Sequence, residues 1–339
     1  MVIDFRSDTV TRPTPAMKEA MMAAPVGDDV FGEDPSINKL EALSAQMFGM
    51  EAALYCPSGT MTNQIAIKCH TQPGDEVICD ETAHVYQYEG GGIAFNAGAS
   101  VKLLQGNRGR LTAEQVLEGI NNNNDVHKAY TSLVCLENTS NRGGGSCYEL
   151  EEIQRIRKVC DANNLKLHLD GARLFNALVA KQQSAKDFGN LFHSISICLS
   201  KSLGCPVGSV LLGSQEFIRR ARRIRKVLGG GMRQAGFMAA AGIYALENSI
   251  TRLQQDHHHA QLIAAAFAEK EFVSYLLPVE TNIIIFGVQP PYTPQALVDK
   301  FKEQDILIYP FSSSSIRLVL HLDITPEMVE KTINTIKSL

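Results

Sequence analysis

The sequence predicts an α/β protein with a mostly parallel sheet flanked by helices, followed by a small C-terminal α+β domain. Apolar strands alternate with helical segments from about residue 50 to residue 213, the pattern of a parallel sheet with helices on both faces. The strands are apolar almost throughout, as expected where both faces are covered. After a helical stretch at about 233–270, the strands and helices of a smaller unit follow.

The first helix is expected at residues 35–48. Asp34 is a suitable N-cap, Pro35 stands at the first helical position, and Gly49 is a stop signal. We expect residues 1–50, which contain this helix, to pack against the small domain or against a partner subunit.

Residues 51–245 are expected to form the large domain. One helix begins near Thr60, and the helix at 111–120 opens with a capping box from Thr112 to Gln115. The predicted strands of this domain are 76–80, 99–105, 131–138, 165–171, 194–201 and 207–213. Two further helices are predicted at 148–164 and 172–181.

Residues 246–339 are expected to hold a linking helix and the small C-terminal domain. Its strands are predicted at 281–288, 306–310 and 316–321, and its helices at 294–304 and 325–339.

Composition excludes several classes of function. The chain has 339 residues and a formal net charge of −4, so nothing favours binding to nucleic acid or to an anionic membrane. No apolar run approaches the ~18 residues of a spanning helix. The eight cysteines are scattered singly without a C-x-x-C pair, which indicates no metal site and fits a reducing cytoplasm. The first ten residues carry charges where a signal peptide needs an apolar stretch, so we expect a cytoplasmic protein.

Polar residues stand where the predicted strands end. Asp170 follows one strand, with Arg173 three residues later, and Lys201 follows another in a turn of small residues. His84 and Glu89 come after the strand at 76–80. Ligands of such sheets bind beyond the carboxyl ends of the strands, so these side chains are candidate site residues.

A strand that leads through Ser58, Gly59 and Thr60 into a helix offers free backbone N–H groups, hydroxyls and the positive end of a helix dipole. These are the features of a phosphate site. A lysine can form a Schiff base with an aldehyde, and an aspartate can keep a pyridine nitrogen protonated. Together with Lys201 and Asp170, this segment supplies the three anchors of pyridoxal 5'-phosphate (PLP), and the imidazole of His84 is suited to stack on the ring.

Each of these residues alone also has an ordinary explanation. Asp170 would cap a turn, Lys201 would be a surface lysine, His84 a loop histidine, and Ser58 a plain N-cap. Their occurrence at successive strand ends favours the cofactor site.

The chain closely resembles the low-specificity L-threonine aldolases, PLP enzymes of fold type I, the aspartate-aminotransferase fold. The resemblance runs from Asp4 to about Arg317 and is looser beyond residue 240. The segments that carry it are FRSDTVTRPTPAM, VGDDVFGEDPS, PSGTMTNQIAI, YEGGG, LHLDGARLFNA and SKSLGCPVGS.

The resemblance implies a role for each site residue. Lys201 would carry the cofactor, Asp170 would pair with its ring nitrogen, Gly59 and Thr60 would bind its phosphate, and His84 would stack on its ring. Ser7, Arg173 and Arg317 would hold the substrate carboxylate, and Glu89 would lie by the substrate side chain or its water. Lys226 and Arg233 match a basic loop that reaches the phosphate of a neighbouring subunit. The resemblance thus implies a homotetramer built from two catalytic dimers.

Two positions depart from the family pattern. Ser202 stands where a glycine is common, which is harmless if its backbone avoids the left-handed region. Ser140 stands where the family commonly has a histidine near the substrate hydroxyl.

The reaction that the resemblance implies is retro-aldol cleavage of L-threonine or L-allo-threonine to glycine and an aldehyde. The base that takes the hydroxyl proton would be His84, or a water held by His84 and Glu89. Two alternatives remain open: another PLP reaction on a 3-hydroxy amino acid, such as β-elimination or racemisation, and a cofactor-free binding protein on the same fold. A redundant buried Lys201 and Asp170 would be costly in the latter.

Overall fold

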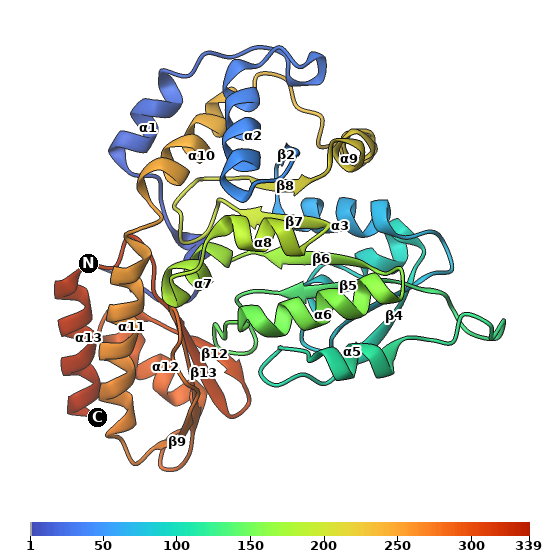
Figure 1. Cartoon of the computed structure of the whole chain (residues 1–339). Helices are drawn as coiled ribbons and strands as arrows, with labels where there is room; N and C mark the ends of the chain where they lie inside the picture. Colours follow the sequence, from blue (N-terminus) through green and yellow to red (C-terminus); the bar gives the residue numbers. More distant parts are fainter. Residues whose placement is uncertain (1) are drawn as a thin grey trace.

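A seven-stranded sheet forms the centre of the computed structural model, which describes residues 2–339 (Figure 1). The strands lie in the order β2-β8-β7-β6-β5-β3-β4, and only β8 runs antiparallel to its neighbours. The bounds are β2 Ala52–Cys56, β3 Glu76–Asp80, β4 Ser100–Leu104, β5 Thr131–Glu137, β6 Lys166–Gly171, β7 Ser194–Cys198 and β8 Ser209–Gly213. The predicted α/β class with a mostly parallel sheet is confirmed.

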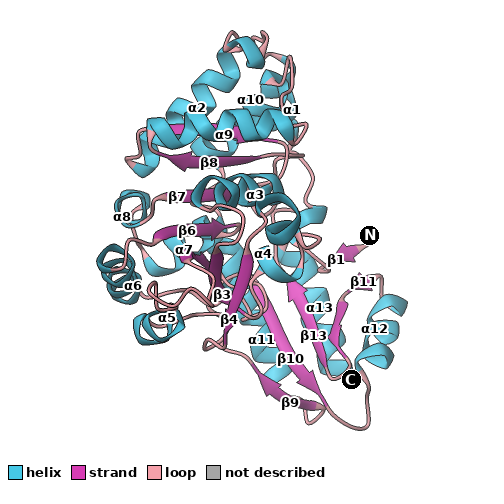
Figure 2. Ribbon diagram, turned by 90° about the vertical axis from the view of Figure 1, so that its right-hand side faces the viewer, coloured by secondary structure: helices cyan, strands magenta, loops and turns pink. Residues whose placement is uncertain are grey.

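Helices cover both faces of this sheet (Figure 1, Figure 2). Helices α2, α5, α6 and α8 share one apolar cluster with the sheet, and α3 and α9 pack on the opposite face. The bounds are α1 Pro15–Met22, α2 Pro35–Phe48, α3 Gly59–His70, α4 His84–Gln87, α5 Ala113–Gly119, α6 Leu150–Ala162, α7 Leu174–Lys181, α8 Ala185–Leu191, α9 Gln215–Val227 and α10 Gly236–Asn248. Alternate residues of a strand face opposite sides, so Val134 and Leu136 join one cluster and Leu133 and Cys135 the other.

The C-terminal part forms an antiparallel sheet of four strands in the order β12-β13-β10-β9. Helices α11 and α13 lie side by side against it, at the lower left of Figure 1. The bounds are β9 Val273–Leu276, β10 Ile283–Val288, β12 Tyr309–Ser312, β13 Ser315–Val319, α11 Leu253–Ala268, α12 Pro294–Glu303 and α13 Pro326–Ser338.

The N-terminal segment divides between the two parts. Strand β1 (Ile3–Asp4) pairs in parallel with β11 (Ile306–Leu307), and Phe5 is buried in the apolar cluster of the C-terminal part. Helices α1 and α2 pack instead on α10, and α2 also packs on β2. Both helices follow the sequence rules, since Thr14 and Asp34 cap them and a proline stands in the first turn of each.

Three local predictions differ from the structure. The helical stretch at 233–270 is broken between α10 and α11, where Ser249 and Thr251 provide side chains that compete for backbone hydrogen bonds. The single strand expected at 306–310 is two, because β11 and β12 belong to different sheets. Helix α8 was not predicted, since it carries an internal Gly189 and buries only Phe188.

All eight cysteines are free and buried, as expected of small core residues. Within residues 2–339 no helix combines the length and the apolar character needed to cross a membrane.

Candidate active site

A small cavity of about 160 Å³ lies where the parallel strands of the large sheet end. Most of the residues expected to bind the cofactor line it, although they come from segments far apart in the sequence. The lining residues are Thr9, Ser58, Gly59, Thr60, Asn63, His84, Asp170, Ala172, Ser196, Cys198, Ser200 and Lys201.

Asp170, near the end of β6, is buried and fixed by two N–H donors. The side-chain Nδ2 of Asn63 donates to Oδ2 at 3.0 Å, and the backbone N–H of Ala172 donates to Oδ1 at 3.1 Å. Both donors favour the ionised carboxylate. The carboxylate is therefore held ready for a cation in the cavity.

Lys201 lies in the turn after β7 and is half-buried at the cavity wall. Within residues 2–339, no hydrogen bond or ion pair engages its Nζ. The turn is closed by the N–H of Gly204, which donates to the carbonyl of Lys201 at 2.9 Å, and Gly204 has φ +82°. The amine thus sits on a rigid turn and is free to react.

The N-terminus of α3 forms one end of the cavity. The Oγ of Ser58 caps the helix by accepting the N–H of Met61 at 3.1 Å. The N–H groups of Gly59 and Thr60 belong to the first turn and have no carbonyl partner within the helix. With the helix dipole, these groups form the phosphate-binding arrangement that the sequence suggests.

His84, the first residue of α4, is held by two carboxylates. Its backbone N–H donates to Oε2 of Glu137 at 2.8 Å, and its Nδ1 lies 3.0 Å from Oε1 of Glu89. Burial acts to lower the pKa of His84, but the hydrogen bond to Glu89 and the charge of Asp170 outweigh it and raise the pKa above its usual value. His84, Glu89 and Asp170 each present one polar atom within 4.8 Å of the others, which makes this corner strongly negative.

Glu89 lies behind His84 and does not line the cavity. Its side chain is completely buried, and its oxygens accept hydrogen bonds from Asn63 Nδ2 at 2.9 Å and Gln64 Nε2 at 2.6 Å. With His84 as its third partner, Glu89 is placed to orient the imidazole rather than to meet a substrate.

Arg173 forms a buried bidentate pair with Asp8. Its Nε and Nη2 donate to the two carboxylate oxygens, each at 2.7 Å, and the Oγ of Ser202 donates to Asp8 at 2.9 Å. Burial acts to raise the pKa of Asp8, but the charges of Arg173 and Lys201 hold it well below its usual range. Ser202 has no positive φ, so the departure from glycine adds a hydrogen bond without backbone strain.

Arg317, on β13, has one nitrogen without a partner. Its Nη1 donates to Oδ1 of Asn141 at 2.8 Å and its Nη2 to the carbonyl of Arg6 at 3.1 Å, while its Nε is buried and unpaired. Burial, followed by the nearby charge of Arg173, lowers the pKa of Arg317 to about 10. An unpaired buried donor is costly, so this guanidinium suits an incoming anion. Ser7 caps the short 3₁₀ helix at Asp8–Val10, where its Oγ accepts the N–H of Thr9 at 3.2 Å.

Ser140 is buried in a turn and is absent from the cavity lining. Its Oγ accepts the N–H of Gly143 at 3.2 Å, and its backbone N–H donates to the carbonyl of Ser146. It also packs so closely on Gly109 that a Cβ built there would lie 2.0 Å from its Oγ. The serine therefore caps a turn at this position.

The basic residues of α9 and the loop after it divide. Arg225 is buried and forms an ion pair with Asp29 at 2.7 Å, whereas Lys226 and Arg233 are exposed and lie outside the cavity. Arg233 pairs with Asp28 of the same chain at 2.8 Å.

Sequence reasoning missed Asn63 and Asp8, although both belong to the site. Asn63 stands four residues after Gly59, one helical turn from the candidate phosphate site and on the same helix face. That spacing was a usable signal. Asp8 had no such signal, because its partner Arg173 lies 165 residues away in the sequence.

Comparison with known proteins adds the family. The family model for beta-eliminating lyases matches residues 4–290. The low specificity L-threonine aldolase of Escherichia coli (strain K12) is 43% identical, covering 97% of this chain and 96% of the relative. Low-specificity L-threonine aldolase 1 of Arabidopsis thaliana is 40% identical over 98% and 94%. The chain belongs to the low-specificity L-threonine aldolases, within the beta-eliminating lyase family.

Solved structures show the same fold. A threonine aldolase of Leishmania major superposes with a TM-score of 0.86 at 21% identity, covering 99% of both chains. A structure of SPT with PLP internal aldimine superposes with a TM-score of 0.75 at 15% identity, covering 99% of this chain and 87% of that one. The predicted fold type I is therefore confirmed.

We expect the protonation of Glu137 to make the stability of the cofactor-free protein depend on pH. Burial, and then the charge of Asp170, raises the pKa of Glu137 to about 7 from the usual 4.5. The folded state therefore holds an extra proton between these values, and the free energy of unfolding falls as the pH rises through this window. In Glu137→Gln this loss should disappear, an effect on the order of 2 kcal/mol between about pH 5 and pH 8.

Denaturant unfolding of both proteins across this pH range measures the effect. The variant also loses one acceptor, which shifts its stability by about 1 kcal/mol at every pH, so only the slopes are compared. Parallel pH profiles would show that Glu137 is ionised throughout.

Proposed function

We propose that this protein is a PLP-dependent L-threonine aldolase that cleaves L-threonine and L-allo-threonine to glycine and acetaldehyde. The observation that carries the proposal is the convergence of Lys201, Asp170, His84 and the N-terminus of α3 on one cavity. The relatives named L-threonine aldolases at about 40% identity over the whole chain support the same reaction.

The residues of the cavity fit PLP. The N–H groups of Gly59 and Thr60, together with the helix dipole, suit its phosphate, and the free Nζ of Lys201 suits its aldehyde. The carboxylate of Asp170 suits a protonated ring nitrogen. When bound, PLP supplies a cationic ring that delocalises the electron pair released when the Cα–Cβ bond breaks.

Arg317 binds the substrate carboxylate through its unpaired Nε. Arg173 lies close to it and has N–H groups that Asp8 does not use, and Ser7 stands nearby on the N-terminal segment. A carboxylate held at this end fixes the rotation of the amino acid, so that the bond from Cα to Cβ is the one placed for cleavage.

His84 takes the proton of the substrate β-hydroxyl. Its Nδ1–H donates to Glu89, which leaves the lone pair of Nε2 to accept that proton. Loss of the proton lets the Cα–Cβ bond break and the aldehyde leave. Glu89 is completely engaged by Asn63, Gln64 and His84, so its role is to orient the imidazole and to stabilise its positive charge.

The active form is a homotetramer made of two catalytic dimers, in which Lys226 and Arg233 of one subunit reach the phosphate of the other. Their exposure and their position outside their own cavity support this arrangement. The enzyme works in the cytoplasm, where eight free buried thiols stay reduced.

The assay that tests the function follows acetaldehyde and ammonia in parallel, with L-threonine, L-allo-threonine and L-serine as substrates. An aldolase releases acetaldehyde and glycine from both threonine epimers without ammonia. Release of ammonia with a keto acid would instead identify a β-eliminating enzyme, the chemistry for which the family is named.

Lys201→Ala is expected to abolish turnover, with a loss of at least about a thousandfold, while the fold is kept. The reason is that the Nζ of Lys201 is the free amine of the cavity. Borohydride reduction of the parent enzyme with its cofactor, followed by peptide mapping, should label Lys201. A label on any other lysine would overturn the assignment.

Arg233→Ala is expected to inactivate the enzyme from the neighbouring subunit. Mixing inactive Lys201→Ala and inactive Arg233→Ala subunits should then restore activity, because a hybrid dimer contains one intact site. About a quarter of the parent activity is expected after full exchange. Exchange is verified by mass spectrometry, and its occurrence without recovery would count against a shared site.

Ser140→Ala is expected to lower stability by about 0.5–1.5 kcal/mol, because the N–H of Gly143 loses its acceptor. The ratio of kcat/KM for the two threonine epimers should stay within about twofold of the parent, since Ser140 lies outside the cavity. Ser132→Ala is the control, because the buried hydroxyl of Ser132 has no partner. A change of several-fold in the epimer ratio would place Ser140 at the substrate.

A further inference from the structure

Asp170 stands at the end of a file of buried hydrogen bonds that crosses the large domain. Asn63 Nδ2 donates to Asp170 at 3.0 Å, and Nε2 of His168 lies 3.1 Å from Oδ1 of Asn63. Nδ1 of His168 lies 2.8 Å from Oγ of Ser194, and Nε2 of His70 lies 2.8 Å from the same Oγ. We refer to Asn63, His168, Ser194 and His70 as the polar file.

Regular secondary structure aligns this file. Asn63 and His70 are seven residues apart on α3, so they lie two turns apart on one face of the helix. His168 and Asp170 are two residues apart on β6 and face the same side of the sheet. Ser194 on β7 is directly paired with His168 in the register. The file therefore runs between α3 and the sheet, parallel to both.

The direction of each bond follows from its partners. The Nδ2 of Asn63 faces two carboxylate oxygens, of Asp170 and Glu89, so Oδ1 is its only free acceptor. It must receive the proton on Nε2 of His168. Burial lowers the pKa of His168 to about 4, so the ring is neutral and its Nδ1 accepts the hydroxyl of Ser194.

The same argument extends to the outer end. Burial holds the pKa of His70 well below its usual value, so this ring also carries one proton at neutral pH. Since Ser194 gives its hydrogen to His168, its Oγ accepts from Nε2–H of His70. Every donor in the file thus points toward Asp170, and aligned hydrogen bonds of this kind strengthen one another.

We propose that Asn63, His168, Ser194 and His70 are positioning residues that act on the cofactor through Asp170. Their aligned donors lower the proton affinity of the Asp170 carboxylate and keep it fixed, so that the proton stays on the ring nitrogen. This inference rests on the proposed function, because that function supplies the ring.

The neighbouring carboxylates show why such a file is needed. Glu137, Glu89 and Asp170 are all buried close together, and like charges at short range favour protonation of one of them. Glu137 has two backbone donors and a raised pKa, whereas Asp170 has the polar file behind its amide donor. The file selects Asp170 as the carboxylate that stays charged.

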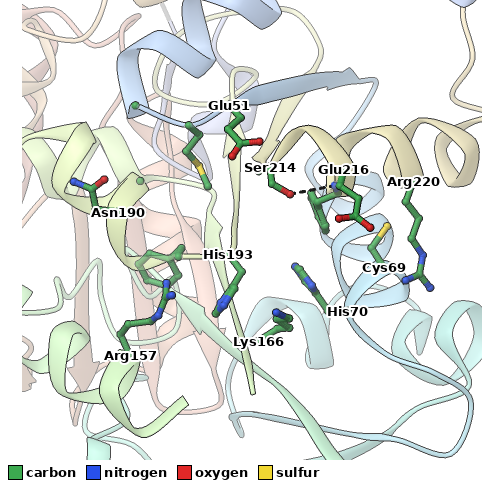
Figure 3. Close-up of a pocket in the computed structure, with 16 residues that line it drawn as sticks. Glu51, Cys69, His70, Arg157, Lys166, Asn190, His193, Ser214, Glu216 and Arg220 are labelled. Atoms are coloured by element: carbon green, nitrogen blue, oxygen red, sulfur yellow. Dashed lines mark hydrogen bonds between the residues drawn. The ribbon is translucent and has the colours of Figure 1, made fainter. Parts of the chain in front are cut away.

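The file ends at a second cavity, of about 610 Å³, on the opposite edge of the sheet where the parallel strands begin (Figure 3). His70 lies there beside His193 and Lys166, and its ring stacks on Phe217 with centroids 4.6 Å apart. The stacking fixes the plane of the imidazole, so its Nε2 stays aimed at Ser194.

Neutron diffraction from the deuterated full-length protein tests the direction of the file without any turnover. Deuterium is expected on Nε2 of both His168 and His70, and on neither Nδ1 atom. Deuterium on Nδ1 of His168 would reverse the file and overturn the proposal. Because this measurement does not use the reaction, it stands even if the protein proves not to be an aldolase.

Ser194→Ala breaks the file in the middle and leaves both Asp170 and Asn63 in place. Ser132→Ala is the matched control, since Ser132 is a buried serine of the same sheet whose hydroxyl has no partner. With ring-¹⁵N-labelled PLP bound, the nitrogen resonance of Ser194→Ala should move toward the unprotonated form, while the control keeps the parent resonance. We also expect kcat to fall by about threefold to tenfold at a KM within about twofold.

Identical nitrogen resonances in Ser194→Ala and Ser132→Ala would show that the file has a structural role only. If Ser194→Ala does not fold, His168→Gln serves instead, because its amide keeps a donor for Asn63 but lacks the acceptor for Ser194. It should show the same shift in resonance. If the nitrogen shifts as expected but none of the proteins releases acetaldehyde, the proposed reaction is wrong and the inference holds.

Discussion

Three buried carboxylates, of Glu89, Glu137 and Asp170, impose the main constraint on this molecule. They lie together at the carboxyl edge of the large sheet, where their charges repel one another in a medium of low dielectric. The structure answers this repulsion with amide donors, with the imidazole of His84, and with a raised pKa for Glu137. The cavity in front of them remains negative at this corner and is suited to a cationic ring.

A second buried charge pair joins the parts of the chain around the cavity. Asp8 comes from the N-terminal segment, Arg173 from the turn after β6, and Ser202 from the turn after β7. Asn282 reaches Ser202 from the C-terminal part, where its Nδ2 donates at 3.2 Å. A buried pair of this kind contributes little net stability, but it fixes the relative placement of the segments that carry it. It sets where the substrate end of the site lies relative to the cofactor end.

The two departures from the family pattern have different consequences. Ser202 uses its hydroxyl to bind Asp8, so the substitution strengthens the charge pair at the substrate end. Ser140 turns its hydroxyl to the N–H of Gly143 and packs against Gly109, so it leaves the substrate hydroxyl to His84. The acid–base chemistry therefore depends on a single imidazole, and Glu89 fixes which nitrogen of that imidazole is free.

The sequence by itself determined the alternation of elements, the caps of the main helices, and the strand ends that carry Asp170, Lys201, His84 and Ser58. These features are local, and parallel strands bring their carboxyl ends to one edge whatever the details of packing. Only the tertiary structure decided that Asp8 binds Arg173, that Glu89 lies behind His84, that Ser140 faces away from the cavity, and that α10 and α11 are separate helices. It also decided the polar file, whose members come from one helix and two strands. A side chain chooses its partner by distance and burial after folding, and no spacing along the chain records that choice.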